Sequence, residues 1–105
     1  LFAPVREGPR AGELRQSIAA FAGRQWVQDD QRADLPMVER LHALAAPTLL
    51  LTGGLDLPDF RLMADQIAAA SPMVERIDDP DAGHLLTLER PNEVAKAMTA
   101  FLRRV

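Results

Sequence analysis

The sequence contains no cysteine, and it lacks any long apolar run. The absence of cysteine excludes disulfide bonds and thiolate metal sites, and it leaves the redox compartment undetermined. No stretch approaches the ~20 consecutive apolar residues of a membrane span, and the first residues lack the charged start and apolar core of a secretion signal. We therefore expect no membrane partner and a cytoplasmic location.

Blocks of basic charge and phosphate-binding glycine motifs are lacking too. The 12 Lys and Arg residues are scattered, and the formal net charge is −3. A nucleic-acid-binding domain normally carries a basic face. The "TGG" of residues 52–54 follows an apolar run, but it belongs to neither a G-x-G-x-x-G nor a G-K-[ST] motif. We therefore expect no nucleic-acid partner and no cofactor.

What the sequence does contain is typical of one modest globular core. Its 105 residues are 48% hydrophobic and 26% charged, without an internal repeat or a low-complexity segment. The chain begins "LFAPVREGPR", without methionine, which is typical of the interior of a longer protein. The alternatives are a processed N-terminus and a natural short chain. We take the fragment as the first interpretation.

The N-terminal part predicts two helices. Two prolines and two glycines in residues 1–12 indicate a loop. A helix over 13–27 is predicted by apolar residues at helical spacing, namely Leu14, Ile18, Phe21, Ala22 and Trp26. The polar stretch that follows should be a loop. A second helix is expected from a cap at Asp34, with Pro36 in its first turn and Val38, Leu41 and Ala45 on one face.

The remainder alternates between strands and helices, which predicts an α/β fold. "TLLLT" at 48–52 is a continuous apolar run that suits a strand of a parallel sheet, and "MVERID" at 73–78 suits an edge strand. Between them we expect a helix capped by Asp59 and ended by Ser71-Pro72, and a last helix is expected over 91–104. Two strands are too few for a stable sheet. Further strands must come from a missing N-terminal part or a second chain.

Two polar loops follow the two predicted strands and carry the candidate site. Carboxyl ends of parallel strands gather catalytic groups, so "TGGLDLPD" should bring Asp56 close to His84 of "DDPDAGH". A carboxylate that accepts from one imidazole nitrogen leaves the other nitrogen free to act as a base. The alternative acid is Asp59, and the simpler interpretation of His84 is a loop histidine that bonds the backbone.

Other polar residues receive structural interpretations. We interpret Asp78, Asp79 and Asp81 as a solvated turn, and a metal site built from them with His84 is disfavoured because His42 lies on a distant helix. We expect Glu89 to cap or brace the last helix. Trp26 and Phe21 should lie in the core or in a cap over a substrate pocket.

Residues 46–102 resemble the C-terminal end of the α/β-hydrolase superfamily. The resemblance rests on an ordered series, "LLLTGGLD", "DFRLMADQIAAA", "MVERID", "AGH", "ERP" and "NEVAKAMTAFL". It implies that Asp56 is the acid and His84 the base of a catalytic triad in an esterase-like hydrolase of small molecules. It also implies that residues 1–45 are the end of a cap and its return to the core, and that 46–105 complete the core.

The sequence departs from that superfamily in its nucleophile. The two serines stand in "RQSIA" and "AASPM", outside any G-x-S-x-G elbow, and no oxyanion-hole loop is present. A chain with acid and base alone lacks the groups that acyl transfer needs, so we expect it to be inactive by itself. The alternative is a non-catalytic α/β module that associates with a partner, or with itself as a homodimer, through an exposed sheet edge.

Overall fold

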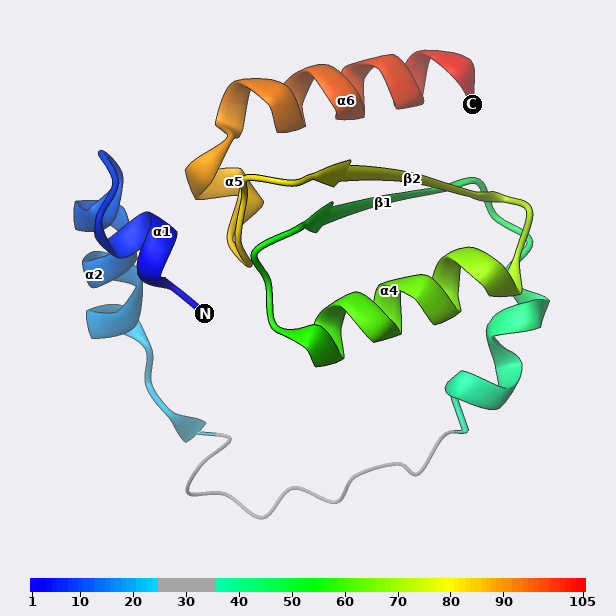
Figure 1. Cartoon of the computed structure of the whole chain (residues 1–105), viewed down its shortest axis with the longest axis horizontal. Coiled ribbons are helices and arrows are strands. Elements are labelled where there is room, and N and C mark those ends of the chain that lie inside the picture. Colours follow the sequence, from blue (N-terminus) through cyan, green and yellow to red (C-terminus); the bar gives the residue numbers. More distant parts are fainter. Residues whose placement is uncertain (25–35) are drawn as a thin grey trace.

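The computed structural model describes residues 1–24 and 36–105. Helices and strands alternate in the second half of the chain, which gives a mixed α/β architecture (Figure 1). In chain order the elements are α1 (Ala3–Arg6), α2 (Ala11–Ala20), the 3-10 helix η1 (Val38–Ala43), β1 (Thr48–Gly53), α4 (Pro58–Ala70), β2 (Val74–Asp79), α5 (Leu86–Glu89) and α6 (Pro91–Arg104).

Strands β1 and β2 form a two-stranded parallel sheet, as the sequence predicts. Thr48 lies opposite Val74 at one end and Gly53 lies opposite Asp79 at the other. Helix α4 connects the strands and lies on one face, and α6 lies on the opposite face (Figure 1). The apolar run of β1 suits this position because helices contact it from both sides.

The core of the described residues is thin. The buried apolar residues are Val5, Leu14, Ala64, Ala82 and Val94. The three leucines of β1 are only half-buried. On α6 Met98 and Leu102 are 49% and 63% exposed, although they belong to its apolar stripe. The two helices therefore cover the faces of the sheet only in part.

The N-terminal segment corrects the prediction of a loop over residues 1–12. Helix α1 forms there, with backbone bonds from Arg6 N to Phe2 O and from Glu7 N to Ala3 O. Pro4 suits the first turn of a helix because it needs no amide donor there. Val5 is buried, and α1 contacts α5 at the carboxyl end of the sheet (Figure 1).

The two predicted N-terminal helices are shorter than expected. Helix α2 begins before residue 13 and ends at Ala20, because Phe21 turns to an extended conformation and Gly23 has a φ of 66°. Residues 38–43 form a six-residue 3-10 helix in place of the expected α-helix. The predictions for Trp26 and for the Asp34 cap lie outside the described residues.

The helix between the strands confirms its predicted extent but corrects its cap. Leu57 is the N-cap residue of α4 and Pro58 opens the first turn, so Asp59 lies inside the helix. The chain leaves the helix at Ser71, as expected. The last helix is confirmed as α6, and the short α5 before it was not predicted. No helix of the described residues is long and apolar enough to span a membrane.

Candidate active site at the carboxyl ends of the strands

The loops after β1 and β2 are joined by backbone hydrogen bonds. Gly54 N donates to Asp79 O at 2.8 Å, and Leu55 N donates to Ala82 O at 2.9 Å. This approach requires glycine. A Cβ at Gly53 would overlap the carbonyl oxygens of Ala82 and Gly83, which lie in the other loop. The "TGG" sequence thus serves close packing of two loops.

The packed loops bring Asp56 and His84 together, which confirms their expected proximity. His84 Nδ1 lies 2.8 Å from Asp56 Oδ2, although the residues are 28 positions apart in the chain. The Asp56 side chain is 12% exposed and that of His84 is 30% exposed. Because an ionised carboxylate can only accept, Nδ1 carries the hydrogen of this bond. The other ring nitrogen, Nε2, then keeps its lone pair when the imidazole is neutral.

The turn around Asp56 orients its carboxylate. Oδ1 accepts from Leu57 N at 2.7 Å, which leaves Oδ2 directed to His84. The amide of Asp56 donates to Gly53 O at 3.2 Å. Asp56, which we preferred to Asp59 as the acid, is therefore the residue bonded to His84. Among the described residues, Asp59 has no hydrogen bond to His84. The catalytic role of the pair stays a prediction.

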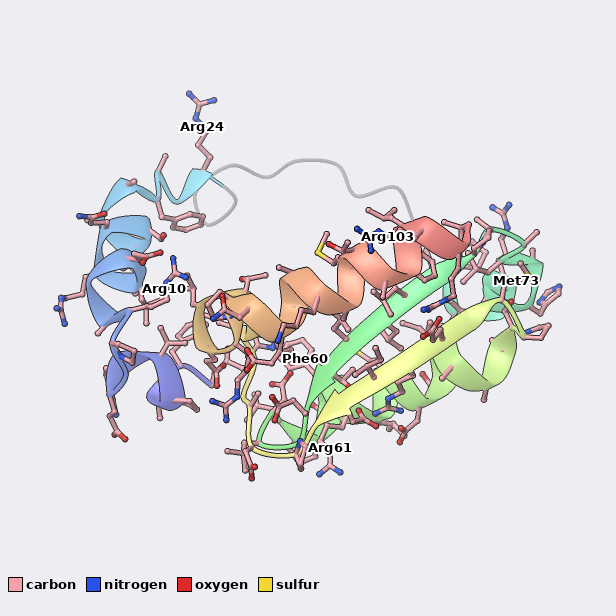
Figure 2. All side chains as sticks on the ribbon, turned by 90° about the horizontal axis from the view of Figure 1, so that it is seen from above. Arg10, Arg24, Phe60, Arg61, Met73 and Arg103 are labelled. Atoms are coloured by element: carbon pink, nitrogen blue, oxygen red, sulfur yellow. The ribbon has the colours of Figure 1, made fainter. Side chains whose placement is uncertain are left out.

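Two aromatic rings lie next to His84. The ring centroid of Phe60, from the first turn of α4, is 4.4 Å from that of His84 with the planes tilted by 40°. Phe2 lies at 6.5 Å in an edge-on arrangement. Figure 2 shows Phe60 at the end of the sheet where α5 lies. Such contacts restrict the imidazole orientation. The sequence predicted only that Phe60 belongs to the apolar stripe of its helix.

Glu89 contacts the histidine loop, which corrects its predicted role at the last helix. Its Oε1 accepts from Gly83 N at 2.7 Å and its Oε2 accepts from Leu85 N at 3.1 Å. The six-residue spacing of "GHLLTLE" allows one turn of helix to fold the carboxylate back to Gly83, but it does not show whether the side chain turns to the loop or to the last helix. Glu89 thus belongs to the site.

The acidic residues before His84 are not a simple solvated turn. Asp78 and Asp79 end strand β2, and Asp79 Oδ2 accepts from Arg90 Nε at 3.1 Å. Asp78 accepts from the Thr52 hydroxyl and from Arg76 Nε. The Thr52 hydrogen bond, followed by Arg76, holds the pKa of Asp78 below its ordinary value.

Among the described residues, no group of three His, Asp or Glu side chains is placed to hold a metal ion. His42 is exposed on η1, which lies at the end of the sheet opposite α5 (Figure 1).

A cavity of about 240 Å³ lies between α6 and the sheet, and it does not include the His–Asp pair. Its lining includes Leu51, Ile77, Val94 and the Asp79–Arg90 ion pair, whereas Asp56 and His84 do not contribute. We interpret it as incomplete packing between the sheet and α6.

Neither serine lies in hydrogen-bond contact with His84. Ser71 is buried where α4 ends, at the opposite end of the sheet, and its Oγ donates to Leu44 O at 2.7 Å. Ser17 lies on α2 and is exposed. Within residues 1–24 and 36–105, the site therefore has an acid and a base and no serine beside them.

Comparison of the chain with family models, curated proteins and solved structures found no match. The geometry of the site and the order of the sequence elements therefore carry the functional argument.

Proposed function

We propose that this chain supplies the acid and the base of an esterase-like hydrolase with an α/β-hydrolase fold. The observation that carries the proposal is the 2.8 Å contact between His84 Nδ1 and Asp56 Oδ2. Both residues follow parallel strands, in the order acid then base that this superfamily uses. The nucleophile and the oxyanion hole are proposed to come from residues outside this chain, so the chain alone is inactive.

In the proposed reaction His84 acts twice. Nε2 takes the proton from the nucleophile's hydroxyl as its oxygen attacks the ester carbonyl carbon, and the imidazolium returns that proton to the leaving alcohol. An acyl-enzyme remains. His84 then takes a proton from water, whose oxygen attacks the acyl carbon, and returns it to the nucleophile's oxygen as the acid product leaves. Asp56 stays ionised throughout and stabilises the imidazolium.

The surroundings of the pair support this role. Asp56 is almost buried and has a second hydrogen bond that fixes its carboxylate, so the position of its charge is set before reaction. The His84 side chain is more exposed than that of Asp56, so a substrate can reach the ring. Phe60 adds an apolar surface next to the base.

The test uses a p-nitrophenyl ester and mass spectrometry of the isolated chain. We expect no enzyme-like turnover and no acyl group on Ser17 or Ser71. In the proposed complete enzyme we expect an acylated serine outside this chain, whose formation is lost with His84→Ala. Acylation of Ser17 or Ser71 that depends on His84 would mean that the chain has its own nucleophile, and the proposal in this form would be wrong.

A second candidate function rests on the open edge of β1. Within the described residues β1 pairs only with β2, and a groove of about 380 Å³ lies beside it. The groove is apolar and is lined by Leu49, Leu51, Met98, Phe101 and Leu102. A further strand, from the same protein or from a second copy, could pair there and cover the groove.

Light scattering over a range of concentrations distinguishes a strand from a second copy from a strand of the same protein. A homodimer that is lost with Leu51→Lys would favour the association module. A monomer at all concentrations favours a hydrolase part whose sheet is completed by other residues of the same protein.

A further inference from the structure

Among the described residues, Glu89 is the one carboxylate that accepts from backbone amides on both sides of His84. Gly83 N donates to one oxygen at 2.7 Å and Leu85 N donates to the other at 3.1 Å. Residues 83–85 belong to neither a strand nor a helix, so their amides have no ladder or helical partner. A carboxylate is a strong acceptor for such amides, and two bonds fix the direction of the loop better than one.

The bonds also connect the loop to the helix that follows it. Leu85 O accepts from Leu88 N at 2.9 Å and from Glu89 N at 3.0 Å, while Leu85 N donates to the Glu89 side chain. This reciprocal arrangement resembles a capping box, in which a glutamate folds back to the start of its own helix. The side chain of Glu89 thus accepts two of the four hydrogen bonds that join α5 to residues 83–85.

Gly83 allows the carboxylate to approach. A Cβ at residue 83 would lie 3.2 Å from Glu89 Oε2, 3.4 Å from Oε1 and 3.0 Å from Pro4 Cγ. Gly83 is buried and Glu89 is half-buried, so water has limited access to these bonds. The glycine before the histidine and the glutamate five residues after it thus act as one unit.

We propose that Glu89 is a positioning residue for His84. By holding the amides before and after the histidine, it fixes the Cα of His84 so that Nδ1 meets Asp56 Oδ2. Glu89 itself touches neither ring nitrogen. The inference rests on the proposed function in calling His84 a base, but the placement of the ring can be measured without activity.

The experiment is NMR of the ¹⁵N-labelled chain with Glu89→Gln, which keeps the size of the side chain and replaces one acceptor oxygen by a donor. We expect hydrogen exchange of the Gly83 and Leu85 amides to become about tenfold faster or more. We also expect the Nδ1–H proton signal of His84 to weaken or disappear, because the ring no longer stays bonded to Asp56.

Glu93→Gln is the matched control. Glu93 lies four residues further on, in the first turn of α6, and is exposed without a hydrogen bond to the His84 loop. This variant should leave both readouts unchanged. Gly83→Ala is the second test, since it keeps the carboxylate but crowds it, and it should give a smaller change in the same direction. It also keeps the inference testable if Glu89→Gln does not fold.

Two outcomes would overturn the inference. Unchanged exchange at Gly83 and Leu85 in Glu89→Gln would show that the bonds do not hold the loop. Faster exchange with an unchanged His84 signal would show that Glu89 braces the loop without positioning the ring. A failure of the proposed function is seen in a separate variant. In that case the ring signals of His84 would not change in Asp56→Asn.

Discussion

The carboxyl end of the sheet and the groove beside β1 differ in how completely their groups are paired. At the carboxyl end the polar groups of two loops bond to one another, including Asp56 with His84 and Glu89 with two amides. In the groove, apolar side chains of β1 and α6 stay partly exposed, and Leu102 is 63% exposed. The difference indicates that the site geometry is set by local loop contacts, whereas the core beside it is incomplete within the described residues.

The largest expected effect is on the packed loops. Gly53→Ala places a Cβ against two backbone oxygens, which cannot move without breaking the loop contacts, so we expect a loss of about 3 kcal/mol or more in unfolding free energy. Gly12→Ala is the control, because nothing lies within 4 Å of a Cβ there and the residue is in helix α2. It should stabilise the chain by about 0.5–1 kcal/mol. Thermal and urea unfolding measure both, and equal effects would contradict the close packing.

The next effect concerns the chemistry of the imidazole. Asp56→Asn removes the charged acceptor of Nδ1–H, so we expect His84 to be acylated by diethyl pyrocarbonate roughly tenfold more slowly. His42 provides an internal control because it is exposed on η1, and its rate should not change. Peptide mapping by mass spectrometry reads both rates in one sample. A fall at both histidines would point to unfolding and not to the loss of an acceptor.

The groove beside β1 should tolerate a polar substitution, whereas the packed loops should not tolerate an added Cβ. Met98→Lys and Leu102→Lys replace exposed apolar side chains on α6, and a lysine can keep its ammonium in water. We expect changes in unfolding free energy within about 0.5 kcal/mol and weaker binding of the dye ANS. Val94→Lys, at a buried position of the same helix, is the contrast and should unfold the chain. Strong destabilisation by Leu102→Lys would show that the groove is closed.

The smallest effect is a dependence on pH. The folded-state pKa of Asp78 is lowered, first by the Thr52 hydrogen bond, so the folded chain binds this proton less readily than the unfolded chain. Its contribution is present above the ordinary value of 3.8 and is lost as the pH falls through and below it. The side chain is 55% exposed, so solvent screening keeps the contribution small. The Tm advantage of the wild type over Asp78→Asn should shrink between pH 6 and pH 3, and Thr52→Val should reduce the same advantage. Here pH 6 lies about two units above the ordinary pKa of Asp78, and pH 3 lies about one unit below it.

The sequence predicted the sheet and its site better than the N-terminal helices. The leucine run of β1 and the apolar stripe of α6 carry strong local patterns, so their extents agree closely with the predictions. The proximity of Asp56 and His84 followed from a general rule for parallel strands. By contrast, α1 depends on a buried Val5 and on contact with α5, which no local pattern encodes.

The parts of the site that were missed depend on tertiary contacts. Phe60 lies on the predicted stripe of its helix, but only the folded loop brings His84 to within 4.4 Å of it. Asp59 has the residue type of an N-cap, yet the helix starts at Pro58, two residues before the start that such a cap implies, and Leu57 takes the cap position. Glu89 was assigned to the wrong helix because sequence spacing does not show which way its side chain turns.

The pairing of Asp56 with His84 is tested by the tautomer of His84, read from the ring ¹⁵N shifts of the chain at a pH where the imidazole is neutral. We predict a hydrogen on Nδ1 and a bare Nε2 for His84, with this preference lost in Asp56→Asn and with no such preference at His42. A hydrogen on Nε2, or the same tautomer mixture at both histidines, would contradict the claim that Asp56 and His84 form an acid–base pair.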